Sequence, residues 1–287
     1  MNTLIVYIKL IRAKHWIKNI LIFLPLIFVL ELSNTALLIK SFIGFLSFSF
    51  LASAVYVIND LLDLSEDKKH KEKKNRPLAS GVISKNAGIF ISCFLLLCSF
   101  ALDAAFYDFN FAALSVLAAY LILNISYSFY LKHLPIIDIV ILSSGFVLRV
   151  LYGSLITGIP ISNWLYLVII AFSLTLGIGK RRNEISLDSR PVLKKYTRDF
   201  LDKTFYMCMA ITIMFYSLWT LDSKTIIAQT GVNLIWTVPL VLIICIRYSF
   251  CIEVKEGGDP VEVLLNDKIL LFLTLIYAAS ILFILYR

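Results

Sequence analysis

Residues 59–81 read NDLLDLSEDKKHKEKKNRPLASG and join two long apolar segments of the chain. An asparagine and three aspartates come first, and a run of cations follows them. Charged side chains are costly to place beside hydrocarbon, and those that occur there usually serve a function. This stretch therefore calls for a chemical explanation as well as a structural one.

The polar side chains at the start of this stretch recur at helical spacing. On a helix that continues the preceding apolar segment, Asn59, Asp63 and Asp67 share one face, and Asp60 lies about 100° away. Like charges four residues apart repel each other, and a bridging divalent cation removes that repulsion. Oxygen ligands without thiol or imidazole favour Mg²⁺, which commonly shares its coordination shell with substrate phosphates. The spacing predicts a Mg²⁺ site on Asn59, Asp63 and Asp67, with Asp60 assisting.

The cations that follow the aspartates admit two interpretations. They could meet the remaining negative charge of a phosphorylated ligand, or they could form a solvated loop that obeys the positive-inside rule. The loop explanation suits most of the lysines but does not explain the regular carboxylates. The cations are Lys68, Lys69, Lys71, Lys73, Lys74 and Arg76.

The composition places the chain in a membrane. Of its 287 residues, 60% are hydrophobic and 16% are charged, whereas a soluble domain is nearly half apolar and about a quarter charged. Only lipid can bury this excess, and no tract resembles a flexible linker, so we expect one integral membrane domain over residues 1–287. The net charge of +8 needs no nucleic acid partner, because a topology bias and anionic ligands account for it.

An all-α membrane protein with about nine spans is predicted, because each span needs about 20 apolar residues. Residues 1–18 mix cations with apolar side chains and predict a retained interfacial helix. The candidate spans lie near residues 19–31, 37–59, 86–102, 111–130, 135–156, 162–179, 203–221, 233–250 and 268–286.

Basic residues are distributed unevenly between the loops on the two sides of this map. One side receives the N-terminal cations and the long polar loops, and the other side receives only Lys40, Lys224 and Arg287. The positive-inside rule then places the N-terminus and the long loops in the cytoplasm. We expect a multi-pass protein of the cell (inner) membrane whose chemistry takes place on its cytoplasmic face.

A second polar segment, GIGKRRNEISLD, covers residues 177–188. Lys180 and Arg181 lie where the sixth predicted span leaves the membrane, and Glu184 and Asp188 are four residues apart. The segment is either a weaker counterpart of the first acidic motif or a topology signal alone.

A third segment, YSFYLKHLPIIDIVILSSGFVLR, covers residues 127–149. Tyr127 and Lys132 flank a short turn, and Asp138 and Arg149 are eleven residues apart on one helix face. A direct contact between them is disfavoured, because eleven residues rise about 16 Å along a helix. An intramembrane arginine usually faces a polar cavity or a partner, so we expect Asp138 and Arg149 to line one polar cavity.

Together these motifs resemble the UbiA-type superfamily of membrane prenyltransferases, whose Asn-Asp-x-x-Asp-x-x-x-Asp signature matches Asn59, Asp60, Asp63 and Asp67. Within it, the chain is most similar to the phosphoribosyl-transferring branch, and one departure is that Glu184 and Asp188 stand where quinone-type members carry a second aspartate motif. The segments that carry the resemblance are RAKHWIKN (12–19), residues 59–81, residues 127–149, GKRRNE (179–184) and GGDPVEVLLNDKIL (257–270).

The resemblance implies an enzyme that transfers 5-phosphoribosyl from phosphoribosyl diphosphate to a polyprenyl phosphate and releases diphosphate. The product would supply lipid-linked pentose for cell-wall glycans such as arabinan. The implied catalytic residues are Asp60, Asp63 and Asp67, around Mg²⁺ on the departing diphosphate. The implied substrate-binding residues are Lys18, Arg76, Tyr127, Lys132, Asp138, Arg149, Lys180, Arg181 and Glu184.

Two other functions remain open at this level. A relative that moves a prenyl group from prenyl diphosphate to an aromatic acceptor would share the fold and the metal, and only its donor would differ. A membrane transporter or scaffold would show no metal-dependent turnover. The gathering of the polar motifs on one predicted face disfavours a path through the membrane, although intramembrane Arg149 is compatible with one.

Overall fold

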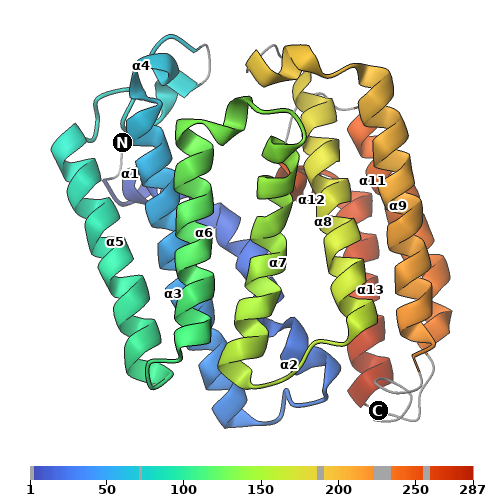
Figure 1. Ribbon diagram of the computed structural model, residues 1–287. Helices are drawn as coiled ribbons and strands as arrows, with labels where there is room; N and C mark the ends of the chain where they lie inside the picture. The colour runs from blue at the N-terminus through green and yellow to red at the C-terminus, as the bar shows by residue number, and fades with distance from the viewer. Residues whose placement is uncertain (1–2, 71–72, 186–190, 223–233, 255–258, 287) are drawn as a thin grey trace. The chain divides into compact units, whose positions relative to one another are not determined.

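The computed structural model describes residues 3–70, 73–185, 191–222, 234–254 and 259–286 (Figure 1). All regular elements within these ranges are helices, which confirms the predicted all-α fold class. Seven of the described helical segments are long and apolar enough to cross a membrane. They are α3 (Thr35–Leu62), α5 (Lys85–Phe106), α6 (Phe111–Phe129), α7 (Ile137–Thr157), α8 (Asn163–Glu184), Leu234–Val254, which contains η7 (Leu234–Thr237) and α11 (Val238–Val254), and α13 (Lys268–Tyr286).

The other two predicted spans differ from these seven. Helix α9 (Arg198–Thr220) matches the predicted span at 203–221, but its first turns carry charged residues such as Asp199 and Lys203. The predicted span at 19–31 is a 3-10 helix, η1 (Ala13–Phe23), followed by the short α2 (Leu24–Phe28). The expected number of nine is therefore approximate.

The N-terminal segment follows contacts with α3, which explains its irregular course. Trp16 Nε1 donates to Ser53 Oγ at 2.9 Å, and Asn19 Nδ2 donates to Ser49 Oγ at 2.8 Å. These bonds fix the segment by its side chains and not by a regular apolar face. Within residues 1–18, where an interfacial helix was expected, the structure has α1 (Thr3–Leu10), which is shorter than predicted, and its interfacial position stays a prediction.

The helices form two compact units. The first contains residues 1–23, 35–131 and 148–158, and the second contains residues 24–34, 132–147 and 159–287. Helix α7 therefore contributes its first half to the second unit and its last turns to the first. The expectation of a single domain over residues 1–287 stays a prediction.

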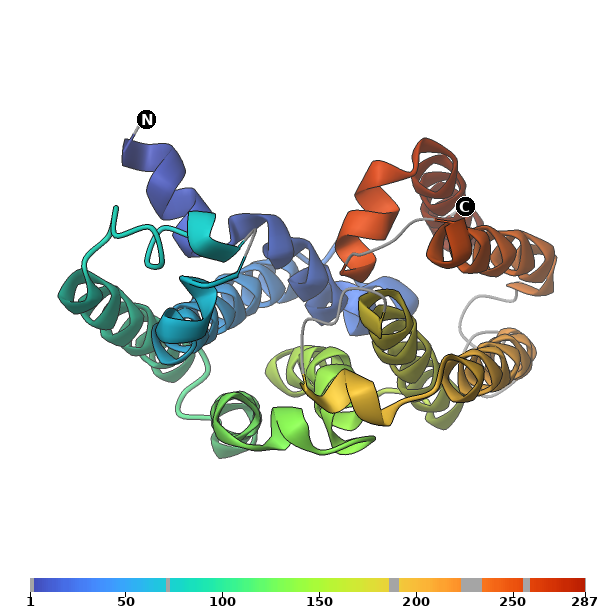
Figure 2. The same ribbon diagram turned by 90° about the horizontal axis from the view of Figure 1, so that it is seen from above.

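Helix α3 is the centre of the first unit, where it lies beside α5 and η1 (Figure 2). Small residues let these helices approach closely, as is common inside membranes. Ser47 Oγ donates to the carbonyl of Ser99 at 2.9 Å, which joins α3 to α5. Gly153 of α7 packs so tightly that an added Cβ would lie 2.2 Å from the carbonyl oxygen of Ile22.

In the second unit, α8 packs along α9, and α11 packs against α13. Its core gathers around Leu201 and Phe205 of α9 and Tyr248 of α11, all of which are buried. The remaining short elements among the described residues are α4 (Leu64–Asp67), η2 (Lys73–Asn75), η3 (Leu131–His133), η5 (Pro191–Lys195) and α12 (Pro260–Asn266).

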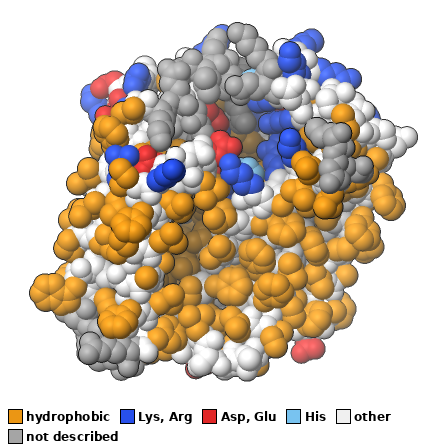
Figure 3. Space-filling view, turned by 180° about the vertical axis from the view of Figure 1, so that it is seen from behind, with side chains coloured by type: hydrophobic (Ala, Val, Ile, Leu, Met, Phe, Trp, Pro, Cys, Tyr) orange, Lys and Arg blue, Asp and Glu red, His pale blue; other side chains and the backbone are white. Residues whose placement is uncertain are grey.

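Hydrophobic side chains cover most of the face seen in Figure 3, and Lys, Arg, Asp and Glu side chains gather toward one end of it. Exposed aromatic and aliphatic side chains such as Phe94, Phe272 and Ile246 belong to the apolar helices. Exposed apolar area of this extent suits lipid, because water would penalise it. The chain is a multi-pass membrane protein.

We expect Gly153→Ala to destabilise the first unit, because its Cβ would collide with the backbone of η1, which cannot rotate away as a side chain can. Overpacking of this kind lowers the free energy of unfolding by about 1–3 kcal/mol. Thermal unfolding of the detergent-solubilised protein measures the effect. Leu155→Ala, at an exposed position of the same helix, is the control. Equal melting temperatures for Gly153→Ala and the unaltered protein would contradict the close approach.

Candidate functional site

The acidic motif lies at the end of α3 and in α4, and the two helices are not continuous. Asp63 sits between them with φ −86° and ψ 7°, outside the regular helical region. The predicted single helix over Asn59–Asp67 is therefore wrong in this detail. Asp60 and Asp67, which are seven residues apart, both contact a common partner.

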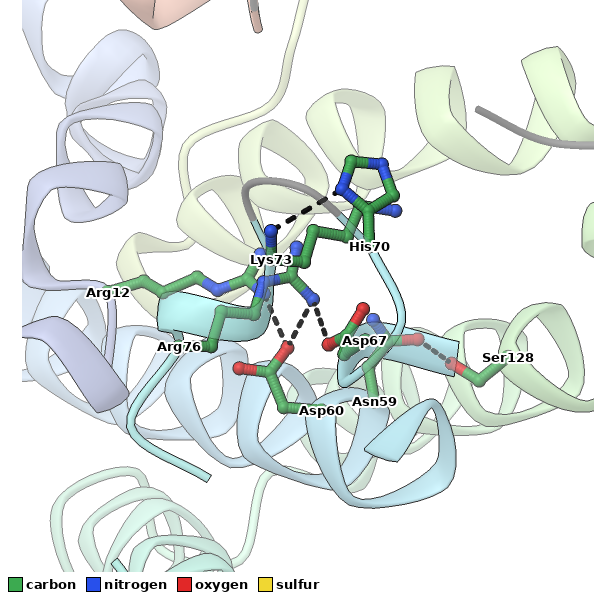
Figure 4. A network of polar contacts seen from close by, with 8 residues as sticks. All are labelled: Arg12, Asn59, Asp60, Asp67, His70, Lys73, Arg76 and Ser128. Atoms are coloured by element: carbon green, nitrogen blue, oxygen red, sulfur yellow. Dashed lines mark hydrogen bonds and ion pairs between the residues drawn. The ribbon is translucent and has the colours of Figure 1, made fainter. Parts of the chain in front are cut away.

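That partner is the guanidinium group of Arg76 (Figure 4). Its Nη1 atom lies 3.0 Å from Asp60 Oδ1 and 2.7 Å from Asp67 Oδ2. Both carboxylates are almost fully buried, whereas about a quarter of the Arg76 side chain is exposed. A cation between two buried carboxylates offsets their mutual repulsion. Arg76 therefore holds Asp60 and Asp67 together.

The loop that carries Arg76 is fixed by an apolar anchor. Leu78 and Ile83 are buried and pack with Val6 and Leu10 of α1 and Val57 of α3. Contact with α1 and α3 thus sets the position of the loop, and with it the direction of the Arg76 side chain.

Arg12 is a member of the cluster to which the sequence analysis assigned no role. Its Nη2 atom lies 2.5 Å from Asp60 Oδ1, and its guanidinium carbon lies 4.7 Å from the centre of the Tyr56 ring. Its backbone has φ +50°, a left-handed conformation that is strained for a residue other than glycine. Strained positions of this kind gather at functional sites. The only signal in the sequence was its place in RAKHWIKN.

Asn59 contacts a helix distant in sequence: its Oδ1 atom accepts a hydrogen bond from Ser128 Oγ of α6 at 2.9 Å (Figure 4). Asp63 is partly exposed. Among the described residues, no group of three or more His, Cys, Asp or Glu side chains is placed to hold a metal ion by itself. A Mg²⁺ ion commonly takes only one or two carboxylates, and water and substrate phosphates complete its shell. Asp60 and Asp67 fit that pattern.

Arg149 lies inside α7 and is buried. Its Nε atom donates to Asn19 Oδ1 at 2.6 Å, and its Nη2 atom donates to the Tyr120 hydroxyl at 3.3 Å. The Phe48 ring centre is 4.9 Å from its guanidinium carbon. Lys18 is near enough to interact electrostatically with Tyr120. Arg149, a predicted substrate-binding residue, therefore contacts Tyr120 of α6 directly. The role of Lys18 stays a prediction.

Asp138 has partners in the second unit. Arg181 Nε lies 2.6 Å from Asp138 Oδ2, and the other end of the guanidinium group pairs with Glu184. The Tyr196 hydroxyl donates to Asp138 Oδ1 at 2.6 Å. Burial and this hydrogen bond raise the pKa of the Tyr196 hydroxyl well above its ordinary value, so it remains a donor at neutral pH. The cavity expected to join Asp138 with Arg149 stays a prediction.

Lys180 and Arg181 differ in exposure although they are adjacent. Arg181 is fully buried, whereas Lys180 is partly exposed and its Nζ atom lies 3.5 Å from Asp259 Oδ2. Asp259 also caps the N-terminus of α12 by accepting from the amide of Val261. Arg181 is therefore placed to order its neighbours, and direct phosphate binding by it stays a prediction. Asp188, the predicted counterpart of Glu184, lies outside the described residues.

The remaining predicted residues are Tyr127 and Lys132. Tyr127 precedes Ser128 in the last turn of α6, Lys132 lies in η3, and both side chains are partly buried. Their roles as substrate-binding residues stay predictions.

Comparison with known proteins gives consistent results. Residues 20–276 match the UbiA prenyltransferase family. The chain is 34% identical to the decaprenyl-phosphate phosphoribosyltransferase of Corynebacterium glutamicum, over 97% of this chain and 86% of that protein. It is 31% identical to the enzyme of the same name from Mycolicibacterium smegmatis, over 96% and 90% of the two chains. Among solved structures, a UbiA homolog from Archaeoglobus fulgidus bound to GPP and Mg²⁺ has a TM-score of 0.74 at 22% identity, over 96% and 99%.

We expect Asp138→Ala to destabilise the second unit strongly, because it removes a carboxylate partner from the fully buried guanidinium group of Arg181. Breaking a buried ion pair lowers the free energy of unfolding by about 3–5 kcal/mol, and we expect the lower end because Glu184 remains. Denaturant or thermal unfolding in detergent measures the change. Asp199→Ala removes the partner of Lys203 in an exposed pair and should have little effect. Similar losses of unfolding free energy in the two variants would contradict a larger contribution from the buried Asp138–Arg181 pair.

Proposed function

Because the chain belongs to the UbiA prenyltransferase family, we propose that it transfers 5-phosphoribosyl from phosphoribosyl diphosphate to a polyprenyl phosphate. The observation that carries this proposal is the 34% identity, over nearly the whole chain, with a protein named decaprenyl-phosphate phosphoribosyltransferase. The product would be a polyprenyl-phosphoryl-phosphoribose that serves the synthesis of pentose-containing cell-wall glycans such as arabinan.

The proposed reaction replaces one phosphate oxygen on the ribose by another. The bond between ribose C1 and the diphosphate oxygen breaks, and diphosphate leaves with the bonding electrons. An oxygen of the polyprenyl phosphate forms the new bond to C1. A phosphate nucleophile is already ionised at neutral pH, so no general base is required. What the protein must supply is position, together with stabilisation of the negative charge that develops on diphosphate.

Asp60 and Asp67, with Asn59 and Asp63 beside them, would hold Mg²⁺ at the donor diphosphate. The metal supplies charge neutralisation of the leaving group. The convergence of the two carboxylates on Arg76 supports this assignment. The solved structure with the same fold and bound GPP and Mg²⁺ is consistent with it, although its donor carries a different group.

Arg76 and Arg12 would bind the donor phosphates. Each arginine side chain is partly exposed, whereas the Asp60 carboxylate that they share is buried. A guanidinium group can offer two parallel hydrogen bonds to a phosphate. Binding of the donor would then add phosphate partners to arginines that are already ordered by Asp60.

The remaining residues have supporting roles in the proposal. Lys18, from the N-terminal segment, would attract the acceptor phosphate, and Lys180 would bind donor phosphate. Arg181 and Glu184 would order this second basic segment, together with Asp138. Tyr127, Lys132 and Arg149 would orient ribose or phosphate. Following the distribution of basic residues, the reaction would take place on the cytoplasmic side of the inner membrane.

An assay with radiolabelled phosphoribosyl diphosphate, polyprenyl phosphate and varied Mg²⁺ tests the proposal. We expect Asp67→Asn to reduce turnover by roughly 100-fold or more, because the leaving group loses a metal ligand. Glu66→Gln changes an exposed carboxylate of the same short helix and should retain activity. Equal activities of Asp67→Asn and the unaltered protein at limiting Mg²⁺ would contradict the metal role.

The same assay separates the alternative functions when the donor is changed. Turnover of a prenyl diphosphate with an aromatic acceptor, without turnover of phosphoribosyl diphosphate, would make the chain an aromatic prenyltransferase. Purified, folded protein that binds neither donor would favour a transporter or scaffold.

A further inference from the structure

One face of α3 is occupied by polar and aromatic side chains that contact residues 11–19. Spacings of four, three and four residues place these side chains along one side of the helix. We call them the polar face of α3. Its members are Ser49, Ser53, Tyr56 and Asp60.

Ser53 is the member of this face that holds the turn between α1 and η1 from both sides. Its hydroxyl donates to the carbonyl of Ile11 at 2.8 Å and accepts from Trp16 Nε1 at 2.9 Å. A serine inside a helix often donates to a carbonyl of its own preceding turn, as Ser49 does to Phe45. Ser53 instead donates to a carbonyl 42 residues away in sequence. Because Ser53 is fully buried, it fixes the backbone of the turn without competition from water.

Arg12 lies in this turn, next to the carbonyl that Ser53 holds. Its φ of +50° is a conformation in which glycine is the usual residue after a helix. A strained residue persists only when its surroundings determine its conformation. The guanidinium carbon lies 4.7 Å from the centre of the Tyr56 ring, and Nη2 lies 2.5 Å from Asp60 Oδ1 (Figure 4). Ser53 thus fixes the backbone of Arg12, and Tyr56 and Asp60 fix its side chain.

The Tyr56 ring adds a restraint that the carboxylate alone does not give. Asp60 Oδ1 is shared, because Arg76 Nη1 also lies 3.0 Å from it. An aromatic ring attracts a guanidinium group through its face and uses none of the N–H donors. The ring therefore restrains Arg12 without competing with a phosphate for those donors.

We propose that Ser53 and Tyr56 are positioning residues that hold Arg12 where its guanidinium group binds the diphosphate end of the donor. They act through Arg12 and not by contact with the substrate. This inference rests on the proposed function and deepens it by naming what orders one of its phosphate-binding arginines. The affinity for diphosphate should then depend on both residues, and the affinity for the acceptor should not.

Calorimetry with Mg²⁺ and inorganic diphosphate, on the purified full-length protein, tests this role. We expect Ser53→Ala and Tyr56→Leu each to weaken diphosphate binding by roughly 3- to 30-fold, because a hydrogen bond or a ring contact that orders Arg12 is lost. Tyr56→Phe keeps the ring and should keep the affinity. In an Arg12→Gln background, neither change should weaken binding further, because residues that act through one partner are not additive. Steady-state kinetics should show an unchanged KM for polyprenyl phosphate.

The control is Ser41→Ala, the same substitution at a buried serine of α3 whose hydroxyl has no hydrogen-bond partner among the described residues. It should leave diphosphate binding unchanged. Tyr56 is partly exposed, so Tyr56→Leu decides the question if Ser53→Ala does not fold.

Three results would overturn the inference: unchanged diphosphate binding in the folded Ser53 and Tyr56 variants, unchanged binding in Arg12→Gln, or losses that add in full to that of Arg12→Gln. A different result would overturn the proposed function while leaving the positioning role intact. In that case the variants would show the expected pattern with inorganic diphosphate, but the unaltered protein would not turn over phosphoribosyl diphosphate.

Discussion

The first unit depends on one electrostatic constraint: two buried carboxylates repel each other, and a cation that contacts both offsets this repulsion. Arg76 supplies this cation from the loop that follows α4, and Arg12 adds a second guanidinium group from the N-terminal segment. Three separate pieces of chain are thereby fixed at the end of α3. Packing of Leu78 and Ile83 sets the position of the loop, and the ion pairs set the direction of the Arg76 side chain.

The second unit meets the same constraint with different residues. Buried Asp138 and partly buried Glu184 both pair with Arg181, whose guanidinium group is fully enclosed. Here the arginine is internal and the neighbouring Lys180 remains accessible. Both units therefore combine a buried charge network with a cation at its edge. Enclosed charges specify geometry, and the edge cations remain able to meet an anionic ligand.

Apolar length and aspartate spacing were sufficient to predict the helical membrane fold and the place of the acidic motif. They could not predict the interruption at Asp63, because helical spacing continues across it in the sequence and no glycine or proline marks the break. Arg12 was missed for a related reason: its partner Asp60 lies 48 residues away. The burial of Arg181 could not be predicted either, because Lys180 and Arg181 are adjacent cations in the sequence. Only the packing of the folded chain determines which of the two is buried.

The left-handed backbone at Arg12 has a consequence for how this sequence can change over generations. A glycine there would relieve the strain, yet it would also remove an ion pair from the buried carboxylate of Asp60. Breaking a buried ion pair costs more free energy than one strained backbone residue releases. Relaxed backbone and retained charge are therefore incompatible at this codon, and we expect arginine to persist there in spite of its conformation.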